Sequence, residues 1–466
     1  MHALSAASVL SLALLAGCPD RTIVAVTPEQ GKVEIKDVPA NPVRDIDILF
    51  QIDDSLSMKD EQDSLRANFS RLIGVLESID GGLPDVQIGV ITPNLGTSAI
   101  DGTTAAPIGT CTGQGEGGVL RAQAPGGPRF LRDVDDKLGG RERNYSGTLA
   151  DAFASLASVG TNGCGIEQHL EAVERALNGS NPENAGFLRP QAYLAVIVIA
   201  DEDDCSLARS TLFDGNHADP TYGDRVNFRC TSQGVACDTP ATDFEAATGL
   251  RKDCHPRFDD TELTKTDRYV QFLKSLKPDP RDVAVAGIVG NPEPFEITKK
   301  GTVTVLKDSC PVGSGPGGTT GIAFPAVRTA DFLEQFPLNT RATICDGDLS
   351  DGLTQIGALL KDAIVDPCFD NQLADADPET PGTQFDCSVT EIRRHPGLPD
   401  EELGVFPQCG NGEFPCWRIE EDAVKCSYTH ANPHLKIVID RNGAVAGPDI
   451  HIKASCVTTD SSGPVP

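Results

Sequence analysis

A short polar segment carries the side chains of this sequence that are best suited to chemistry. Asp53, Ser55 and Ser57 alternate along it in the order Asp-Asp-Ser-Leu-Ser. This spacing places one carboxylate and two hydroxyls on one turn of the chain, and such hard oxygen atoms are the ligands that divalent cations prefer. Because Asp60 follows Ser57 by three residues, the segment could instead cap a helix. Metal binding and helix capping are therefore both open, and Ser57 could do both.

A second acidic segment, Asp-Glu-Asp-Asp at 201–204, follows the most apolar stretch of the chain, 192–200. An aliphatic run of this kind is typical of a strand buried on both faces of a parallel sheet. Residues 46–52 predict another strand, directly before Asp53. Because ligands of open parallel sheets bind at the carboxyl ends of the strands, we expect Asp53 and Asp201 to lie close together.

Strands and helices are predicted to alternate around these two segments. The predicted strands are 46–52, 86–91, a short one near Val119 and Leu120, 192–200 and 283–289, with a hairpin over 295–306. The predicted helices are 65–79, 148–156, 166–177, 269–276 and 354–364. Such alternation favours an α/β, Rossmann-like fold with a mostly parallel central sheet that is flanked by helices.

At the Asp-Xaa-Ser-Xaa-Ser motif, and at the acidic end of the apolar strand, the chain resembles the von Willebrand factor type A family. The metal-ion-dependent adhesion site of that family takes ligands from three loops, which carry this motif, a Thr before a later helix and an Asp after the central strand. The resemblance implies five metal ligands: Asp53, Ser55, Ser57, Thr161 and Asp201. Thr148 is the weaker candidate for the Thr, because we expect it to open a helix.

The resemblance, which covers about residues 46–365, also implies a cofactor and a partner. The cofactor is a divalent cation, Mg²⁺ first, with Mn²⁺ and Ca²⁺ as alternatives. The partner is a protein whose acidic residue completes the coordination of the metal. Asp203 and Asp204 could hold a second cation, although exposure to solvent is the simpler interpretation.

Four segments are predicted along the chain: a lipoprotein signal peptide (1–17), a lipidated Cys with a tether (18–43), a type A domain (44–365) and a small, Cys-rich, β-rich module (366–466). The domain contains an insertion over 205–260. Because this insertion begins four residues after Asp201, we expect it to lie over the metal face. There it could select a partner or block access.

The N-terminal residues predict export and anchoring. Leu15-Ala16-Gly17-Cys18 follows an apolar run and resembles a bacterial lipobox, which implies lipidation of Cys18. We therefore expect a lipid anchor in the membrane of the cell envelope, at the outer membrane and facing the periplasm or the surface. An ordinary cleaved signal with a chance Cys is the alternative. No Lys or Arg precedes the apolar run, which departs from the usual positively charged start of a signal peptide.

The cysteine count agrees with an oxidising compartment. Of 15 cysteines, setting aside Cys18 leaves an even number, which suits seven disulfides whose pairing the sequence leaves open. No Cys-Xaa-Xaa-Cys pair is present, which disfavours zinc ribbons and thioredoxin-like chemistry. A disulfide from Cys164 or Cys205 would fix a metal loop, although plain cross-linking is the simpler interpretation.

Composition and missing motifs narrow the function. The net charge of −29 repels nucleic-acid phosphates and suits cations, basic partners or mere solubility. The sequence has no His-Glu-Xaa-Xaa-His, no Gly-Xaa-Ser-Xaa-Gly and no phosphate-binding loop, so we do not expect an enzyme. Three functions remain: a metal-dependent protein-binding or adhesion module, a structural envelope protein whose metal site is vestigial or stabilising, and a client-binding subunit of a larger assembly.

Overall fold

The computed structural model describes residues 33–459, apart from 41–44, 80–81, 137, 139, 191, 214–225, 240–247, 260–261, 278–279, 312–321, 366–367, 378, 380–381, 396–397, 424–425, 427–428, 430, 445 and 448. The predicted signal peptide and Cys18 lie outside the described residues. No helix in the described part of the chain is long and apolar enough to cross a membrane.

Seven strands form the central sheet, in the order β12-β9-β6-β2-β3-β4-β5. Their bounds are β2 Asp45–Ile52, β3 Asp85–Ile91, β4 Phe130–Asp135, β5 Arg141–Arg143, β6 Tyr193–Ala200, β9 Val283–Val289 and β12 Leu338–Thr343. Strands β12, β9, β6, β2 and β3 run parallel, whereas β4 and β5 are antiparallel to their neighbours. Ile52 of β2 lies level with Ile199 of β6, so these two strands end side by side.

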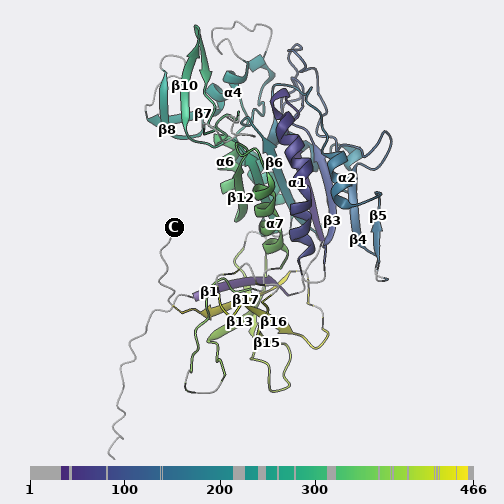
Figure 1. The fold of residues 1–466 in the computed structure, drawn as a ribbon, viewed down its shortest axis with the longest axis vertical. Helices are drawn as coiled ribbons and strands as arrows, with labels where there is room; N and C mark the ends of the chain where they lie inside the picture. Colours follow the sequence, from purple (N-terminus) through teal and green to yellow (C-terminus); the bar gives the residue numbers. More distant parts are fainter. Residues whose placement is uncertain are drawn as a thin grey trace, which may run out of the picture.

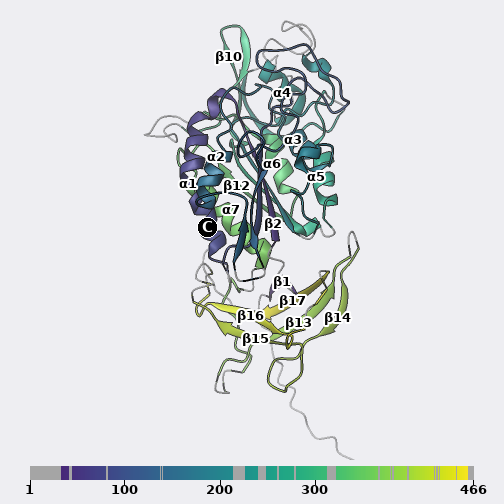
Figure 2. The same ribbon diagram turned by 90° about the vertical axis from the view of Figure 1, so that its right-hand side faces the viewer.

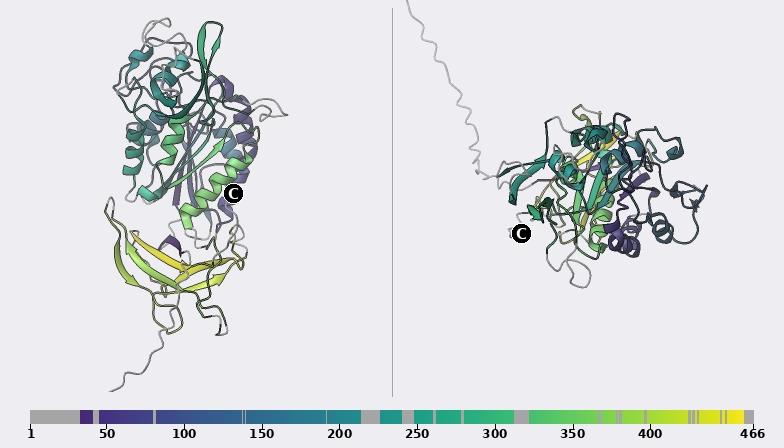
Figure 3. Two further views of the ribbon diagram at one scale, coloured as in Figure 1. Left: turned by 90° about the vertical axis from the view of Figure 1, so that its left-hand side faces the viewer. Right: turned by 90° about the horizontal axis from the view of Figure 1, so that it is seen from above.

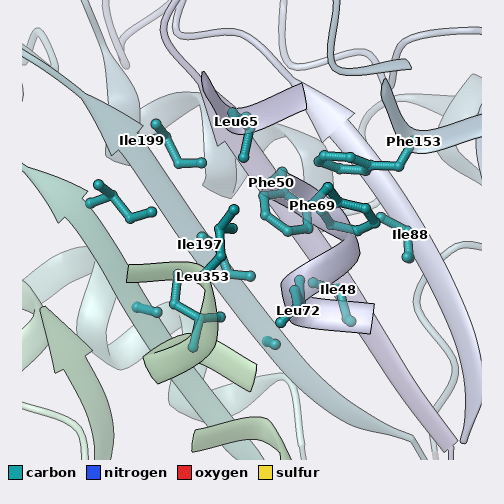
Figure 4. Packing of buried hydrophobic residues seen from close by; sticks show 14 of the residues in the cluster. Ile48, Phe50, Leu65, Phe69, Leu72, Ile88, Phe153, Ile197, Ile199 and Leu353 are labelled. Atoms are coloured by element: carbon teal, nitrogen blue, oxygen red, sulfur yellow. The ribbon is translucent and has the colours of Figure 1, made fainter. Parts of the chain in front are cut away.

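Helices cover both faces of this sheet (Figure 2). On one face lie α1 Lys59–Glu77, α2 Leu149–Leu156 and α7 Ser350–Val365, and on the other α3 His169–Leu177, α5 Thr266–Ser275 and α6 Val327–Glu334. The apolar spacing of α1 explains its packing, because Leu65, Phe69 and Leu72 point at the sheet residues Ile48 and Phe50 (Figure 4). Short 3₁₀ helices are η1 Leu56–Met58, η2 Pro182–Asn184, η3 Ser210–Phe213 and η4 Pro280–Asp282.

The insertion and a later hairpin build a second sheet at one end of the molecule (Figure 1). Its strands are β7 Val235–Thr239, β8 Gly249–Pro256, β10 Phe295–Lys300 and β11 Val303–Leu306, in the order β11-β10-β8-β7. Helix α4 Val226–Gly234 precedes β7. The hairpin predicted over 295–306 is confirmed as β10 and β11.

Two further sheets lie at the opposite end of the molecule (Figure 3). One has the order β1-β17-β13-β14, with bounds β1 Val33–Pro39, β13 Cys387–Arg393, β14 Glu401–Val405 and β17 Ile450–Val457. The other pairs β15 Cys416–Glu421 with β16 Leu435–Asp440. Residues 33–39, which the sequence analysis placed in the tether, thus form a strand that pairs with β17 over its whole length. These sheets bury a core of their own around Phe369, Val389 and Trp417.

The sequence predicted an α/β, Rossmann-like fold with a mostly parallel central sheet, and this prediction is wrong for this chain. Among the described residues there are four sheets, of which three are antiparallel throughout and the seven-stranded one is mixed. The sequence interpretation followed the longest apolar runs, which mark doubly buried strands, and it undercounted short strands that have one polar face. The strand expected near Val119 and Leu120 is absent from the described chain. Leu120 is instead buried in a loop, and its N–H donates to the side chain of Asn184.

Seven disulfides are present, as the even cysteine count predicted. The pairs are Cys111–Cys164, Cys205–Cys230, Cys237–Cys254, Cys310–Cys345, Cys368–Cys426, Cys387–Cys456 and Cys409–Cys416. Two of these cysteines lie close to the strand ends. Cys164 follows Gly163, whose N–H donates to Asp54 in the loop after β2, and Cys205 lies in the loop after β6. The Cys205–Cys230 bond ties the exit of β6 to helix α4 of the insertion.

Candidate metal centre

The ends of β2 and β6 bring two buried aspartates together. Asp53 follows β2, and its N–H donates to the carbonyl oxygen of Ile199 at 3.0 Å. Asp201 is the first residue after β6. The Asp53 side chain is fully buried and that of Asp201 nearly so, since the two residues are 0% and 1% exposed. The parallel register therefore places two carboxylates, far apart in the sequence, at one edge of the sheet.

The two serines of the first loop join this pair. The N–H of Ser55 donates to Asp53 Oδ1 at 2.7 Å, which folds the loop back on its first residue. The hydroxyl oxygens of Ser55 and Ser57 are 3.1 Å apart, and either could be the donor. The Ser57 hydroxyl also donates to Asp201 and thereby lowers the pKa of that carboxyl. Neither η1 nor α1 has a side-chain cap hydrogen bond, so helix capping does not use these serines.

The loop of Thr161 lies against the same turn. Gln62 Nε2 donates both to the carbonyl oxygen of Asp53, at 2.9 Å, and to that of Gly160, at 2.8 Å. The N–H of Gly163 donates to the carbonyl oxygen of Asp54 at 2.8 Å. Within the described residues, however, the Thr161 hydroxyl makes no hydrogen bond to the other four predicted ligands. The structure thus brings four of the five side chains together and places the loop of the fifth beside them.

Thr148 lies elsewhere, at the start of α2. Its side-chain oxygen accepts a hydrogen bond from the N–H of Asp151 at 3.1 Å. This is the N-cap geometry that satisfies a free N–H in the first turn of a helix. The expectation that Thr148 opens a helix is confirmed.

The electrostatics of the aspartate pair favour a cation. Asp53 Oδ2 and Asp201 Oδ1 are buried and have no hydrogen-bond partner in the described structure. Burial raises the pKa of Asp53, and the negative charges of Asp201 and Glu202 raise it further. Burial likewise raises the pKa of Asp201 to about 7, with Glu202 as the next largest cause. Two unpaired carboxylate oxygens beside two hydroxyls form a donor set of hard oxygen atoms, which fits a divalent cation.

Three glutamates at this edge were not foreseen. Glu167 and Glu202 share a hydrogen bond, and Glu61 lies close enough to Asp201 to raise the pKa of that aspartate. Oxygens of Glu61 and Glu167 are also buried without a partner in the described structure. The only sequence cue for Glu167 is its place just before α3. No group of three or more His, Cys, Asp or Glu side chains arranged to hold a metal is found among the described residues.

Asp204 is not solvated, contrary to the simpler expectation, and Asp203 is only partly exposed. Asp204 is fully buried and pairs with Arg328 at 2.9 Å, and it accepts the N–H of Leu170 at the start of α3. Asp203 accepts the N–H groups of Arg328 and Thr329 at the start of α6. These two aspartates therefore fix helices to the end of β6. The expectation is wrong because Arg328, far along the chain, compensates the buried charge.

The insertion lies beside the strand ends, and the first loop keeps an open side. Helix α4 contributes Phe228 and Cys230 to a pocket that Glu202 also lines. Leu56, between the two serines, is 79% exposed, and Ser57 is exposed as well. The described part of the insertion therefore borders the edge without covering the serine loop.

Comparisons with known proteins do not assign a family. No protein-family model and no curated protein matches the chain. Among solved structures, proximal thread matrix protein 1 from the mussel byssus aligns with a TM-score of 0.28 and 11% identity, over 72% of this chain and 51% of that one. The pilus adhesin RrgA from Streptococcus pneumoniae aligns with a TM-score of 0.25 and 12% identity, over 92% of this chain and 58% of that one. The chain thus spans little more than half of either protein, and similarities this low carry no argument about function.

Proposed function

We propose that this chain is a metal-dependent protein-binding module of the cell envelope. The observation that supports the proposal best is the pair of buried, unpartnered oxygens Asp53 Oδ2 and Asp201 Oδ1 beside two serine hydroxyls. Burying unpaired carboxylate oxygens is costly unless a cation or a proton compensates them. A divalent cation is the compensating group that the oxygen donors suit.

Each predicted ligand has a distinct role in this proposal. Asp53 and Asp201 supply the negative charge, Ser55 and Ser57 supply neutral oxygens, and Thr161 supplies a further oxygen from the neighbouring loop. When bound, the metal offers a Lewis-acidic position to a carboxylate of a partner protein. The exposed side chain of Leu56 lies on the same loop and offers the partner an apolar contact.

Metal titration tests the site. We expect calorimetry to show Mg²⁺ or Mn²⁺ binding to the full chain, and the substitution Asp53→Asn to weaken it by about tenfold or more, because one of two charged ligands is lost. Asp60→Asn is the matched control, since Asp60 is an exposed acid on the first turn of α1. Equal affinities for the wild type and Asp53→Asn, or no binding by the wild type, would refute the site.

A second experiment separates binding from mere stabilisation. In the Mn²⁺ complex, the paramagnetic relaxation of water protons reports a coordination position that is open to solvent. We expect strong relaxation, and a decrease when glutarate is added as a stand-in for a partner's carboxylate. A structural protein with a closed, stabilising metal site would gain thermal stability from Mn²⁺ and show no response to glutarate.

We also propose that Cys18 anchors the protein to the membrane of the cell envelope. The lipobox-like residues 15–18 support this assignment. In a bacterial host, radiolabelled palmitate should label the wild type and not Cys18→Ser, and the variant should leave the membrane fraction. Labelling of the Cys18→Ser variant would contradict the anchor.

A further inference from the structure

A small pocket of about 80 Å³ lies between the end of β6 and the insertion. Its acidic wall is lined by Glu167, Glu202, Asp203 and Asp204. Its apolar wall is lined by residues such as Phe228 of α4, Leu306 of β11 and Phe324. The pocket thus combines a concentrated negative charge with a surface of carbon atoms.

The acidic wall is only partly compensated. Asp204 pairs with Arg328, and Asp203 is held by N–H groups of α6. By contrast, no Lys or Arg of the described chain forms an ion pair with Glu167 or Glu202. The hydrogen bond that these two glutamates share holds one proton, so the pair keeps one negative charge. Asp53 and Asp201 lie close enough to add further negative charge. The pocket therefore keeps an excess of negative charge that a positively charged ligand would offset.

Glu167 is the group that points to a ligand. It is only 4% exposed, it lines the pocket, and its Oε1 has no hydrogen-bond partner in the described structure. A buried carboxylate oxygen without a partner is rare in proteins, because it loses its water without replacement. A donor arriving from the pocket would satisfy this oxygen.

The apolar wall decides which cation fits. A divalent metal takes about six oxygen ligands around it. The side chains of Phe228, Leu306 and Phe324 contain no oxygen and therefore cannot be such ligands. An ammonium group on an alkyl chain matches both walls, because its N–H groups can donate to carboxylates while its methylenes lie against aliphatic and aromatic carbon.

We propose that this pocket binds a primary alkylammonium group, which could come from a lysine side chain of a partner protein or from a free alkylamine. Glu167 and Glu202 accept its hydrogen bonds, and Phe228 with Leu306 encloses its methylenes. The pocket adjoins the proposed metal centre, since Glu202 directly follows Asp201, but none of the five proposed metal ligands lines it.

The test uses the full chain in the presence of a metal chelator, so that the result is independent of the metal proposal. Calorimetry and NMR titrations compare three probes: N-acetyl-lysine N-methylamide, n-butylamine, and N-acetyl-norleucine N-methylamide, which keeps the carbon chain and lacks the charge. We expect at least one of the amines to bind and the norleucine compound not to. Tighter binding of the lysine compound assigns the site to a partner's lysine, whereas tighter binding of butylamine assigns it to free amines.

Variants locate the binding. Glu167→Gln should weaken amine binding by about tenfold or more, since it removes one charged hydrogen bond. Methylammonium is added here as a fourth probe. Phe228→Ala should weaken the binding of butylamine more than that of methylammonium, because only butylamine reaches the apolar wall. Asp60→Asn, on α1, should leave the affinities for the amines unchanged. Circular dichroism should show that all three variants are folded.

Three outcomes would overturn the proposal. Equal binding of the norleucine compound would make the pocket merely apolar. If neither amine binds, the pocket does not bind alkylammonium groups. Displacement of the amine by one equivalent of Mg²⁺ or Ca²⁺ in the Asp53→Asn variant would show that the pocket holds a metal instead.

Discussion

The edge formed by Asp53, Asp201, Glu167 and Glu202 concentrates more buried charge than the chain itself neutralises. Elsewhere the same chain neutralises its buried acids: Asp47 has Arg189 at 2.8 Å, and Asp133 has Arg143 at 3.0 Å. Because unpaired buried charge destabilises a fold, its restriction to one edge is typical of a site that is completed by something else. Both proposals made above, a metal and an amine, follow from this imbalance.

His169 should make the protein sensitive to acid. Its ring is fully buried, and burial lowers its pKa to about 4 from 6.5, against the opposing effects of Asp204 and of a hydrogen bond to the backbone of Glu202. Between pH 6.5 and 4, His169 is therefore protonated in the unfolded chain and neutral in the folded chain. The free energy of unfolding consequently falls as the pH falls through this window.

Urea denaturation at two pH values measures this effect. Between roughly pH 7.5 and 5, the wild type should lose about 2 kcal/mol more of its unfolding free energy than His169→Phe, in which nothing titrates at this position. Because neighbouring acids titrate in both proteins, only the difference between them is informative. Equal losses would mean that the ring gains its proton as readily in the folded state.

The Asp204–Arg328 pair should be essential for stability. Both side chains are buried, at 0% and 2% exposure, so Asp204→Ala would leave a guanidinium without its charge partner. We expect a loss of about 3–5 kcal/mol in unfolding free energy. Asp63→Ala is the matched control: Asp63 pairs with Lys59 at 2.7 Å and also with Arg66, but all three side chains are at least 36% exposed, and the loss should stay below about 0.5 kcal/mol. Similar losses for both variants would contradict the role of burial.

The sequence allowed some of these residues to be predicted. Asp53 and Asp201 were accessible because each directly follows an apolar run, and strand ends of a sheet meet at one edge. Ser55 and Ser57 were accessible because they alternate with Asp53 along the same segment. Glu167 was not, since nothing local distinguishes an acid that faces a pocket from one that faces water. The burial of Asp204 was missed for the same reason, because its partner Arg328 is 124 positions away.

Among the elements, the loop that carries Thr161 is held by close contact. A methyl group added at Gly163 would lie 2.1 Å from Asp54 Oδ1, so Gly163→Ala must push the loop or Asp54 aside. If Thr161 contributes to the metal site, Mg²⁺ affinity should fall about tenfold, as it does when residues that support a metal site are changed. Gly165→Ala serves as the control, because its nearest neighbour would be 4.0 Å away. An unchanged affinity in Gly163→Ala would remove Thr161 from the site.

Elements with a strong apolar pattern were predictable, and those with a weak one were not. Helices α1, α2 and α5 and strands β2, β6 and β9 agree with the predicted ranges to within a few residues, except that α1 begins six residues earlier. The exposed edge strand β14 had no comparable pattern, since all five of its residues are exposed. Pairing between distant segments, as between β1 and β17, leaves no local trace in either strand.

At the scale of the whole molecule, the described chain has separate apolar cores. Trp417 is the only tryptophan, and it packs with Val38, Phe369 and Ile452 at the end that holds β1 and β17. The cores on the two faces of the central sheet are built from residues between Ile46 and Ile364, and they do not include Trp417 or the three residues that pack against it. Tryptophan fluorescence should therefore report one part of the molecule, and helical circular dichroism the other.

Deletion of residues 33–39 tests this separation. Removal of β1 exposes the edge of β17 and takes Val38 from the core, so the urea midpoint seen by Trp417 fluorescence should fall. The midpoint seen by far-ultraviolet circular dichroism should stay unchanged, because the helices of the described chain all lie in the other part. A common shift of both midpoints would show that the two parts unfold as one unit.

The pairing of β1 with β17 also constrains the order of assembly. Asp37 and His451 contact each other across these strands although 414 positions separate them. During synthesis or export, β1 emerges before every other described strand, but its partner β17 emerges last. The central sheet therefore has all of its strands available earlier than the sheet to which β1 belongs, so the order of emergence decides which half of the molecule can be completed first.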